Sequence, residues 1–190
     1  GHAVVHWFQQ SFFVILPEIK LALGLTAVQA GALQTVRSVA GGLVNFPVGF
    51  LTDLLITRWP LLLAASVVWI SVAYLLVGVV GLPSVVENLG LANSFLLMMG
   101  AMGLVGMGGA IWHPPAISAL SQRFSERRGF AVSIHGVGGS TGDTVAGLTV
   151  GVMLLVFAWY DLLRVAVIPA LLMALLVYLA LRGFRGEGRN

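Results

Sequence analysis

Long apolar runs, separated by glycine, proline and charged residues, divide this chain into six segments. The runs cover about residues 2–23, 26–53, 60–81, 91–122, 128–157 and 161–181. Each run holds roughly the 20 mostly apolar residues that a helix needs to cross a bilayer. The pattern predicts an all-α membrane protein with six transmembrane helices in a single domain over residues 1–190.

Local signals place the ends of several of these helices. Gly24 and Leu25 are followed by Thr26 and, three residues later, Gln29, the spacing of a helix stop and a capping box. The first two segments should therefore form a tight hairpin. Pro60 should open the third segment, and residues 82–90 should form the one longer connection.

The composition excludes an ordinary soluble domain. Of the 190 residues, 58% are hydrophobic and 9% are charged, against roughly half and a quarter in soluble domains. The absence of cysteine excludes a disulfide framework and a cysteine nucleophile. The net charge is only +3, and the ten basic residues are scattered along the chain rather than gathered in a run. The sequence therefore does not predict a nucleic-acid-binding surface. The first apolar segment lacks a basic leader, which predicts a mature span rather than a signal peptide.

The distribution of basic residues predicts the orientation. Basic residues are more frequent in cytoplasmic loops than in loops on the other side. Lys20 and Arg164 fall at one set of helix ends, and seven arginines fall at the other: Arg58, Arg123, Arg127, Arg128, Arg182, Arg185 and Arg189. Both termini should therefore be cytoplasmic, with residues 182–190 as a basic cytoplasmic tail.

Shifting the chain by 98 positions aligns residues of the same type at similar depths in the segments. The aligned pairs are Pro17 and Pro115, Ile19 and Ile117, Gly31 and Gly129, Val39 and Val137, Gly41 and Gly139, and Gly49 and Gly147. Because the shift carries the chain across three helices, the second copy would enter the membrane from the opposite side. The alignment predicts two inverted repeats of three helices, over about residues 1–81 and 91–181.

Two charged residues fall near the middle of predicted membrane helices. Arg37 lies in the second segment and Asp143 in the fifth, at similar depths. An uncompensated charge there costs about 3 kcal/mol or more, so we expect the two to pair. The alternatives are that each lines a wet cavity or that Arg37 snorkels.

Histidines are candidates for proton coupling because their charge changes near neutral pH. His113 and His135 lie inside the fourth and fifth segments, and His6 and His2 lie in the first turns of the first. Each could instead form a hydrogen bond between helices, and exposure at the headgroups is the favoured expectation for His2. No HxxxH-type spacing accompanied by a carboxylate occurs, so the sequence predicts neither a metal site nor a cofactor.

Other polar and aromatic residues mark a candidate solute path. Gln9, Gln10 and Phe13 lie on the first segment, where they could line the path or pack between helices. Trp112 and His113 precede two prolines that leave backbone carbonyls without a donor, which favours a kink and a site there.

Glycines should let several of these helices approach closely. They are Gly41, Gly42, Gly138, Gly139, Gly142 and Gly147. Residues 138–142 also fit the GxSxG pattern of serine hydrolases, but the strand-to-helix turn that this motif requires cannot form inside a membrane helix. The sequence therefore does not predict an enzyme.

Several of these stretches resemble the major facilitator superfamily. Residues 49–53, from Gly49 to Asp53, followed by a basic residue at Arg58, are similar to the loop signature of that family between its second and third helices. Residues 127–129, which precede the glycine-rich fifth segment, are also similar to that family. Within it, the His113 to Pro115 stretch and residues 133–142 look most like the fosmidomycin-resistance branch. Three positions depart from the loop signature, namely Leu54, Ile56 and Thr57, so Asp53 and Arg58 alone remain to pair in the gating loop.

The resemblance implies the amino-terminal half of a twelve-helix transporter in a bacterial inner membrane. The first and fourth helices would line a central cavity, the second and fifth would meet the other half, and the third and sixth would face lipid. A second half would have to complete the cavity for a small solute, supplied by a second copy, by a separate chain or by the rest of a longer protein. The alternative is a transmembrane scaffold that no longer transports.

Overall fold

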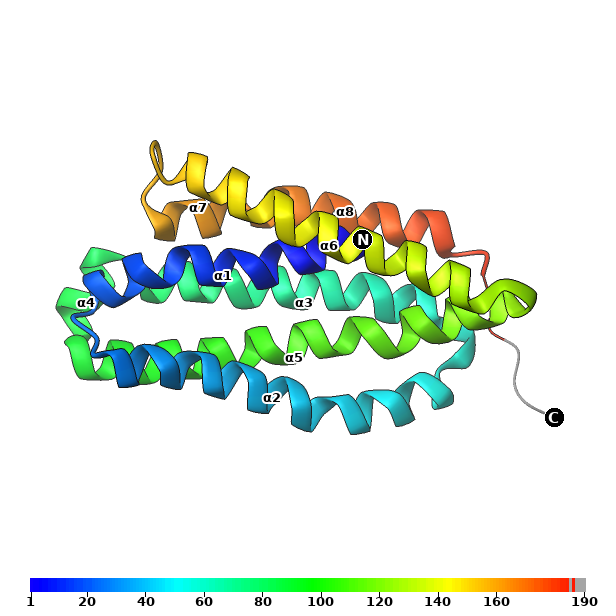
Figure 1. Ribbon diagram of the computed structural model, residues 1–190. Coiled ribbons are helices and arrows are strands. Elements are labelled where there is room, and N and C mark those ends of the chain that lie inside the picture. Colours follow the sequence, from blue (N-terminus) through cyan, green and yellow to red (C-terminus); the bar gives the residue numbers. More distant parts are fainter. Residues whose placement is uncertain (185, 187–190) are drawn as a thin grey trace.

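The computed structural model describes residues 1–184 and 186, and it shows an elongated bundle of helices that run along a common direction (Figure 1). The long helices are α1 (His2–Ala22), α2 (Ala27–Leu54), α3 (Trp59–Val80), α5 (Leu91–Arg123), α6 (Arg128–Met153) and α8 (Val167–Leu181). The short elements are α4 (Pro83–Leu89), α7 (Trp159–Val165) and two 3-10 turns, η1 (Ile56–Arg58) and η2 (Ser125–Arg127). The expected all-α fold is confirmed.

Three helical stretches in the described part of the chain are long and apolar enough to cross a membrane. They cover Ile56–Val80, Leu91–Arg123 and Trp159–Leu181. The helices α1, α2 and α6 are also longer than 18 residues, but they carry more polar side chains and do not reach the same apolar character. These three helices hold His6, Arg37 and Asp143, and they also carry exposed polar residues such as Ser38 and Thr144.

Most helix ends lie where the local sequence signals predicted them. Thr26 caps α2 through a capping box, in which Gln29 Oε1 accepts from the Thr26 backbone N–H at 2.9 Å. Gly24 adopts a φ of +61°, which a side chain would strain, and this allows the tight turn between α1 and α2. Pro60 lies in the first turn of α3, as expected.

Two predicted segments differ from the structure. The connection over residues 82–90 contains the short helix α4, which ends at Gly90 with a φ of +78°. The predicted sixth span is built from α7 and α8, with a break near Ala166. α5 continues through Pro114 and Pro115 without ending.

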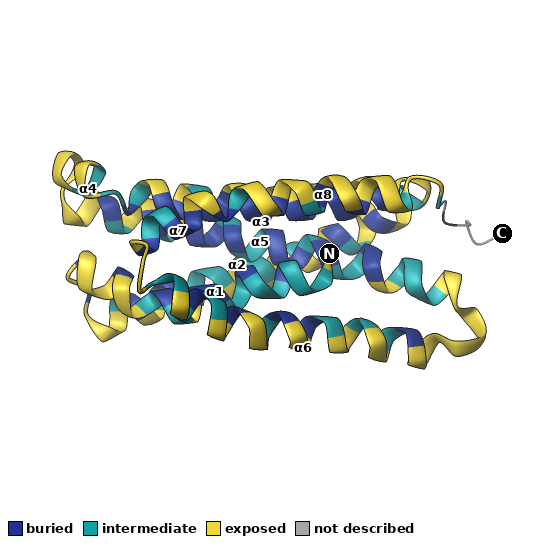
Figure 2. Cartoon of the chain, turned by 90° about the horizontal axis from the view of Figure 1, so that it is seen from above, coloured by how far each residue is buried: buried dark blue, intermediate teal, exposed yellow. Residues whose placement is uncertain are grey.

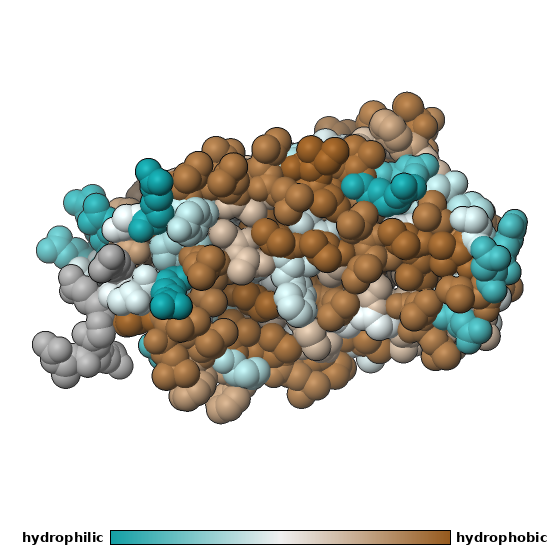
Figure 3. All heavy atoms as spheres, turned by 180° about the vertical axis from the view of Figure 1, so that it is seen from behind, coloured by the Kyte–Doolittle hydropathy of each residue, from teal (hydrophilic) through white to brown (hydrophobic). Residues whose placement is uncertain are grey.

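The core lies where α1, α3 and α5 face one another and where α7 and α8 cover α3 (Figure 2). α1 packs along α6, α2 packs along α5, and α3 packs along both α5 and α8. Trp59 and Trp159 are buried in this core. Many large apolar side chains are exposed on the outside of the bundle, and Figure 3 shows, on one face, hydrophilic residues gathered mostly towards the two ends.

Glycines set the closest approaches between helices. A Cβ at Gly106 would lie 1.9 Å from the carbonyl oxygen of Arg37, and one at Gly41 would lie 3.0 Å from the carbonyl oxygen of Gly106. A Cβ at Gly142 would lie 2.2 Å from the carbonyl oxygen of Ala3. The backbones of α2 and α5, and of α1 and α6, therefore touch at positions that admit only glycine.

Not all of the expected packing glycines face another helix of this chain. A Cβ at Gly42, Gly138 or Gly147 would meet nothing within 4 Å. Their packing partner stays a prediction, because α2 contacts α5 and α6 contacts α1 through other positions.

Replacing Thr26 with alanine should lower the free energy of unfolding by about 0.5–2 kcal/mol, because the Thr26 hydroxyl no longer accepts from the Gln29 backbone N–H. The thermal midpoint in detergent micelles measures this change. Thr35→Ala is the matched control, since Thr35 is exposed within the same helix and bonds only to the Gly31 carbonyl. Equal loss in both variants would mean that the cap contributes nothing specific.

Candidate functional site

Four histidines from three helices meet at one place in the bundle. His2 and His6 lie four residues apart on α1 and therefore share one face of that helix. Their ring centroids are 4.4 Å apart, and the ring of His113 on α5 lies 5.4 Å from His2 and 5.8 Å from His6. His135 on α6 stacks on His2 at 3.7 Å. We call these four residues the histidine cluster.

Three of the four imidazoles are held by hydrogen bonds to their Nδ1 atoms. His6 Nδ1 lies 3.1 Å from both carboxylate oxygens of Asp143. His2 Nδ1 donates to the backbone carbonyl of His135 at 2.6 Å, and His113 Nδ1 donates to the carbonyl of Gly109 at 2.9 Å. These bonds fix the orientation of the rings and tie α1 to α6.

The expected pair of Arg37 and Asp143 does not form. Asp143 pairs with His6, and the Arg37 guanidinium donates to Gln34 at 3.2 Å and lies 5.2 Å from the ring centroid of Phe13. The pairing expectation is wrong because α1 packs along α6 and so presents His6 to Asp143. Arg37 instead receives cation–π contacts from the aromatic side chains of α1.

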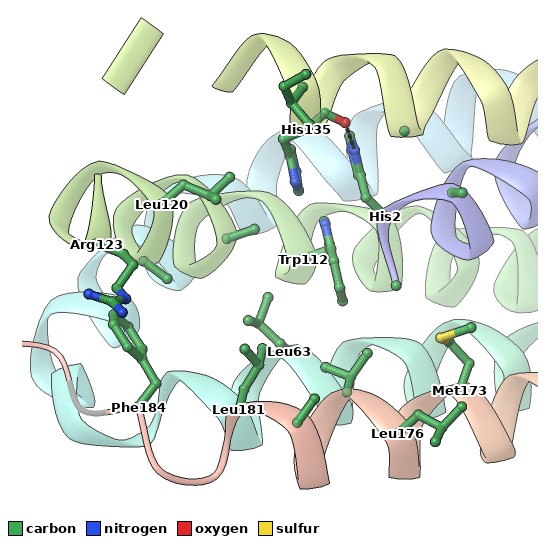
Figure 4. A pocket seen from close by; sticks show the side chains of 18 of the residues that line it. His2, Leu63, Trp112, Leu120, Arg123, His135, Met173, Leu176, Leu181 and Phe184 are labelled. Carbon is green, nitrogen blue, oxygen red and sulfur yellow. Dashed lines mark hydrogen bonds between the residues drawn. The ribbon is translucent and has the colours of Figure 1, made fainter. Parts of the chain in front are cut away.

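Three buried nitrogens beside the cluster have no hydrogen-bond partner among the described residues. They are His2 Nε2, His135 Nε2 and Trp112 Nε1. Figure 4 shows the three side chains beside a cavity of about 860 Å³, with Arg123 and Phe184 towards another part of its wall. Most of the remaining wall is apolar. The cavity therefore combines an apolar wall with a few unpaired polar groups, as ligand sites do.

Glycines of neighbouring helices make room for the polar side chains of α1. A Cβ at Gly139 would lie 2.9 Å from His2 Cε1 and 3.0 Å from His6 Nε2, and one at Gly109 would lie 2.2 Å from the amide nitrogen of Gln9. The histidine rings of α1 therefore pack on α6 at Gly139, and Gln9 packs on α5 at Gly109.

The remaining predicted site residues lie away from the histidine cluster. Gln10 is half-buried and Phe13 is 46% exposed. Asp53 in the last turn of α2 and Arg58 at the end of η1 are exposed, and no ion pair joins them in the described structure. The remaining pairing expected of the gating loop is therefore wrong for these two residues, and a Cβ at Gly49 in the same loop region would meet nothing within 4 Å.

The predicted tail over residues 182–190 falls only partly in the described structure. Phe184 stacks on Trp59 at 6.2 Å between ring centroids, and the backbone N–H of Gly186 donates to Ile56. Residues 185 and 187–190, which include Arg185 and Arg189, lie outside the described residues.

Sequence reasoning missed the place of His2. It favoured exposure at the headgroups, whereas His2 is half-buried and contacts the other three histidines. The spacing of four residues between His2 and His6 was the available signal. The carboxylate beside them comes from a helix 137 residues later in the chain, which no local spacing reveals.

Comparison with known proteins decides the family. The sequence profile of the Major Facilitator Superfamily matches residues 1–189. The chain belongs to this superfamily. It is therefore a helical membrane protein of a transporter family and not of a family of enzymes, and the resemblance inferred from its motifs is confirmed.

Two relatives within the superfamily are similar over most of this chain. The fosmidomycin resistance protein of Escherichia coli (strain K12) is 27% identical over 176 residues, which are 90% of this chain and 40% of that protein. The uncharacterized MFS-type transporter YfnC of Bacillus subtilis (strain 168) is 24% identical over 183 residues, 93% of this chain and 41% of that protein. The chain spans about two fifths of the length of these relatives.

Proposed function

We propose that this chain forms one six-helix half of a transporter that moves a small organic solute across the bacterial inner membrane. In this proposal α1, α2, α3, α5, α6 and the α7–α8 pair each span the bilayer, and both ends of the chain are cytoplasmic. The observation that carries the proposal is the histidine cluster, because membrane proteins rarely place ionisable groups inside a bundle without a function for them.

The helix contacts support two inverted repeats. α1 packs along α6 while α2 packs along α5, so the first helix of each repeat meets the second helix of the other. The matched glycines behave alike: Gly41 lies against α5 and Gly139 lies against α1. Neither Gly49 nor Gly147 has a neighbour within 4 Å of a built Cβ. A pseudo-twofold axis would produce these equivalences.

The outward faces of α2 and α6 support a second half. On α2, Phe46 is 87% exposed and Leu43 is 72% exposed, and on α6 Leu148 is 71% exposed. Two exposed glycines, Gly42 and Gly147, belong to the same two helices. Small and apolar residues of this kind allow close contact with further helices. Alternating access of this type requires two halves that move against each other around a site.

A transmembrane scaffold is the second candidate. It is favoured by the gating loop, where Leu54, Ile56 and Thr57 depart from the family signature and Asp53 and Arg58 form no ion pair. A scaffold would keep the fold without moving a solute.

Uptake into proteoliposomes distinguishes the two candidates. The first solute to test is fosmidomycin, because the E. coli relative is named for resistance to it. We expect saturable uptake that changes with an imposed pH gradient and falls in variants at His113 and Asp143. A scaffold would give no uptake above empty liposomes in any gradient.

The second half can be tested by single-cysteine labelling, since the 190 residues contain no cysteine. In the reconstituted full-length protein, a cysteine at Phe46 on α2 should be protected from a lipid-phase reagent. A cysteine at Leu172 on α8, which is 59% exposed, should react because that helix would face lipid. Equal reaction at both positions would contradict a covering half on α2.

A further inference from the structure

The histidine cluster offers three ring nitrogens at one point. One ring nitrogen from each of His2, His6 and His113 lies within 4.8 Å of the other two. We propose that these three residues bind a divalent transition-metal ion of the zinc class, and that Asp143 positions His6 as a ligand.

The hydrogen bonds leave the same atom of each ring free for the metal. Because the carbonyls of His135 and Gly109 can only accept, His2 and His113 carry their proton on Nδ1 in the neutral state. His6 donates from Nδ1 to the Asp143 carboxylate in the same way. Each neutral ring then presents an unprotonated Nε2 lone pair, which is the form that binds a metal.

Asp143 supplies the outer interaction that metal-binding histidines commonly have. A carboxylate that accepts from the second ring nitrogen orients the imidazole and raises its basicity. The carbonyls of His135 and Gly109 have the same role for His2 and His113. All three ligands therefore have a partner that fixes the ring.

The spacing of the ligands suits a tetrahedral ion after a small movement. Zinc–nitrogen distances of about 2.0–2.1 Å place tetrahedral ligand nitrogens roughly 3.4 Å apart. The ligand atoms lie within 4.8 Å of one another, so α1 must move slightly towards α5 to reach that separation. His2 Nε2 is already buried without a partner, so a metal would satisfy it.

The donor set selects the class of metal. Three imidazoles suit zinc, cobalt, nickel or copper, whereas magnesium and calcium prefer oxygen ligands. Three protein ligands also leave a fourth position for water or a solute donor group. The site would join α1 to α5 and lie at the edge of the cavity beside Trp112.

This proposal depends on the geometry of the cluster and not on the transported solute. Metal binding can therefore be measured in protein that has not been shown to transport anything, and a failure of uptake would leave it standing. Conversely, a transporter that uses the histidine cluster without a metal would take up solute but would not bind zinc.

The experiment is zinc titration of the full-length protein in detergent, purified with a tag that contains no histidine. Isothermal titration calorimetry gives the stoichiometry and the dissociation constant, and the visible spectrum of bound cobalt reports the coordination geometry. We expect one ion per chain, tetrahedral cobalt, and no displacement by excess magnesium.

Variants identify the ligands. His2→Gln, His6→Gln and His113→Gln should each weaken zinc binding at least about tenfold, and Asp143→Asn should weaken it about 10–100-fold. Asp161→Asn is the matched control for Asp143→Asn, because Asp161 pairs with Arg164 and touches none of the four histidines. It should bind zinc as the unchanged protein does.

Two results would overturn the proposal. The first is a dissociation constant of about 1 mM or weaker for zinc and the unchanged protein, irrespective of the results for the variants. The second is tight binding that persists in all three histidine variants, which would place the ion elsewhere. Size-exclusion chromatography of each variant separates a lost ligand from a lost fold.

Discussion

Gly106→Ala should lower the free energy of unfolding of the bundle by about 1–3 kcal/mol. A Cβ at this position would lie 1.9 Å from the Arg37 carbonyl oxygen and 2.8 Å from its carbonyl carbon. Both atoms are backbone, so no side-chain rotation relieves the clash and α2 must move away from α5. The thermal midpoint in detergent should fall accordingly.

Gly100→Ala is the matched control on the same helix. Gly100 is exposed, and a Cβ there would meet nothing within 4 Å. Because alanine has a higher helix propensity than glycine by up to about 1 kcal/mol, this variant should be as stable as the unchanged protein or more so. A similar loss of stability at both positions would show that close contact at Gly106 is not what limits the packing.

The sequence predicts where helices begin and end better than it predicts which helices pack against one another. Thr26, Gln29 and Pro60 act on the helix that contains them, so their effects could be read locally. The direction in which a glycine points depends on which helices pack against its own. Gly139 and Gly147 therefore looked equivalent in the sequence, yet the structure places one against α1 and leaves the other facing outward.

The contacts of the candidate site are also set by helix packing, which local sequence does not reveal. Depth along the helix could place Arg37 and Asp143 at similar levels, but depth alone does not say which helix lies between them. α1 packs along α6 and brings His6 to Asp143, while Arg37 meets Phe12 and Phe13. The spacing of His2 and His6 on one helix was readable, whereas their contacts with α5 and α6 depend on tertiary packing.

Asp143→Asn should reduce solute uptake in proteoliposomes at least about tenfold under the proposed function. Asparagine keeps the size of the side chain but removes the negative charge that lies 3.1 Å from His6 Nδ1. A hydrogen bond to a charged group contributes about 1.5–3 kcal/mol, and roughly 1.4 kcal/mol corresponds to a factor of ten in rate. The initial rate of uptake measures the change.

Asp161→Asn is the control for removing a carboxylate in general. Asp161 pairs with Arg164 at 2.9 Å near one end of the bundle, and both side chains are more than 40% exposed. The Asp143 side chain is exposed to a similar degree, 44%, so the two variants differ in the place of the carboxylate and not in its exposure. Uptake should change little because Asp161 lies away from the histidine cluster. If this variant lost as much uptake as Asp143→Asn, the effect would be one of charge or folding and not of the site.

A double-mutant cycle tests whether His6 and Asp143 act as a unit. Each single change removes the same interaction, so the combination of His6→Gln and Asp143→Asn should lose no more uptake than the worse single variant. If the two residues acted separately, their losses would multiply. Full multiplication would therefore show that the 3.1 Å contact does not couple them during transport, even though it joins α1 to α6 in the folded protein.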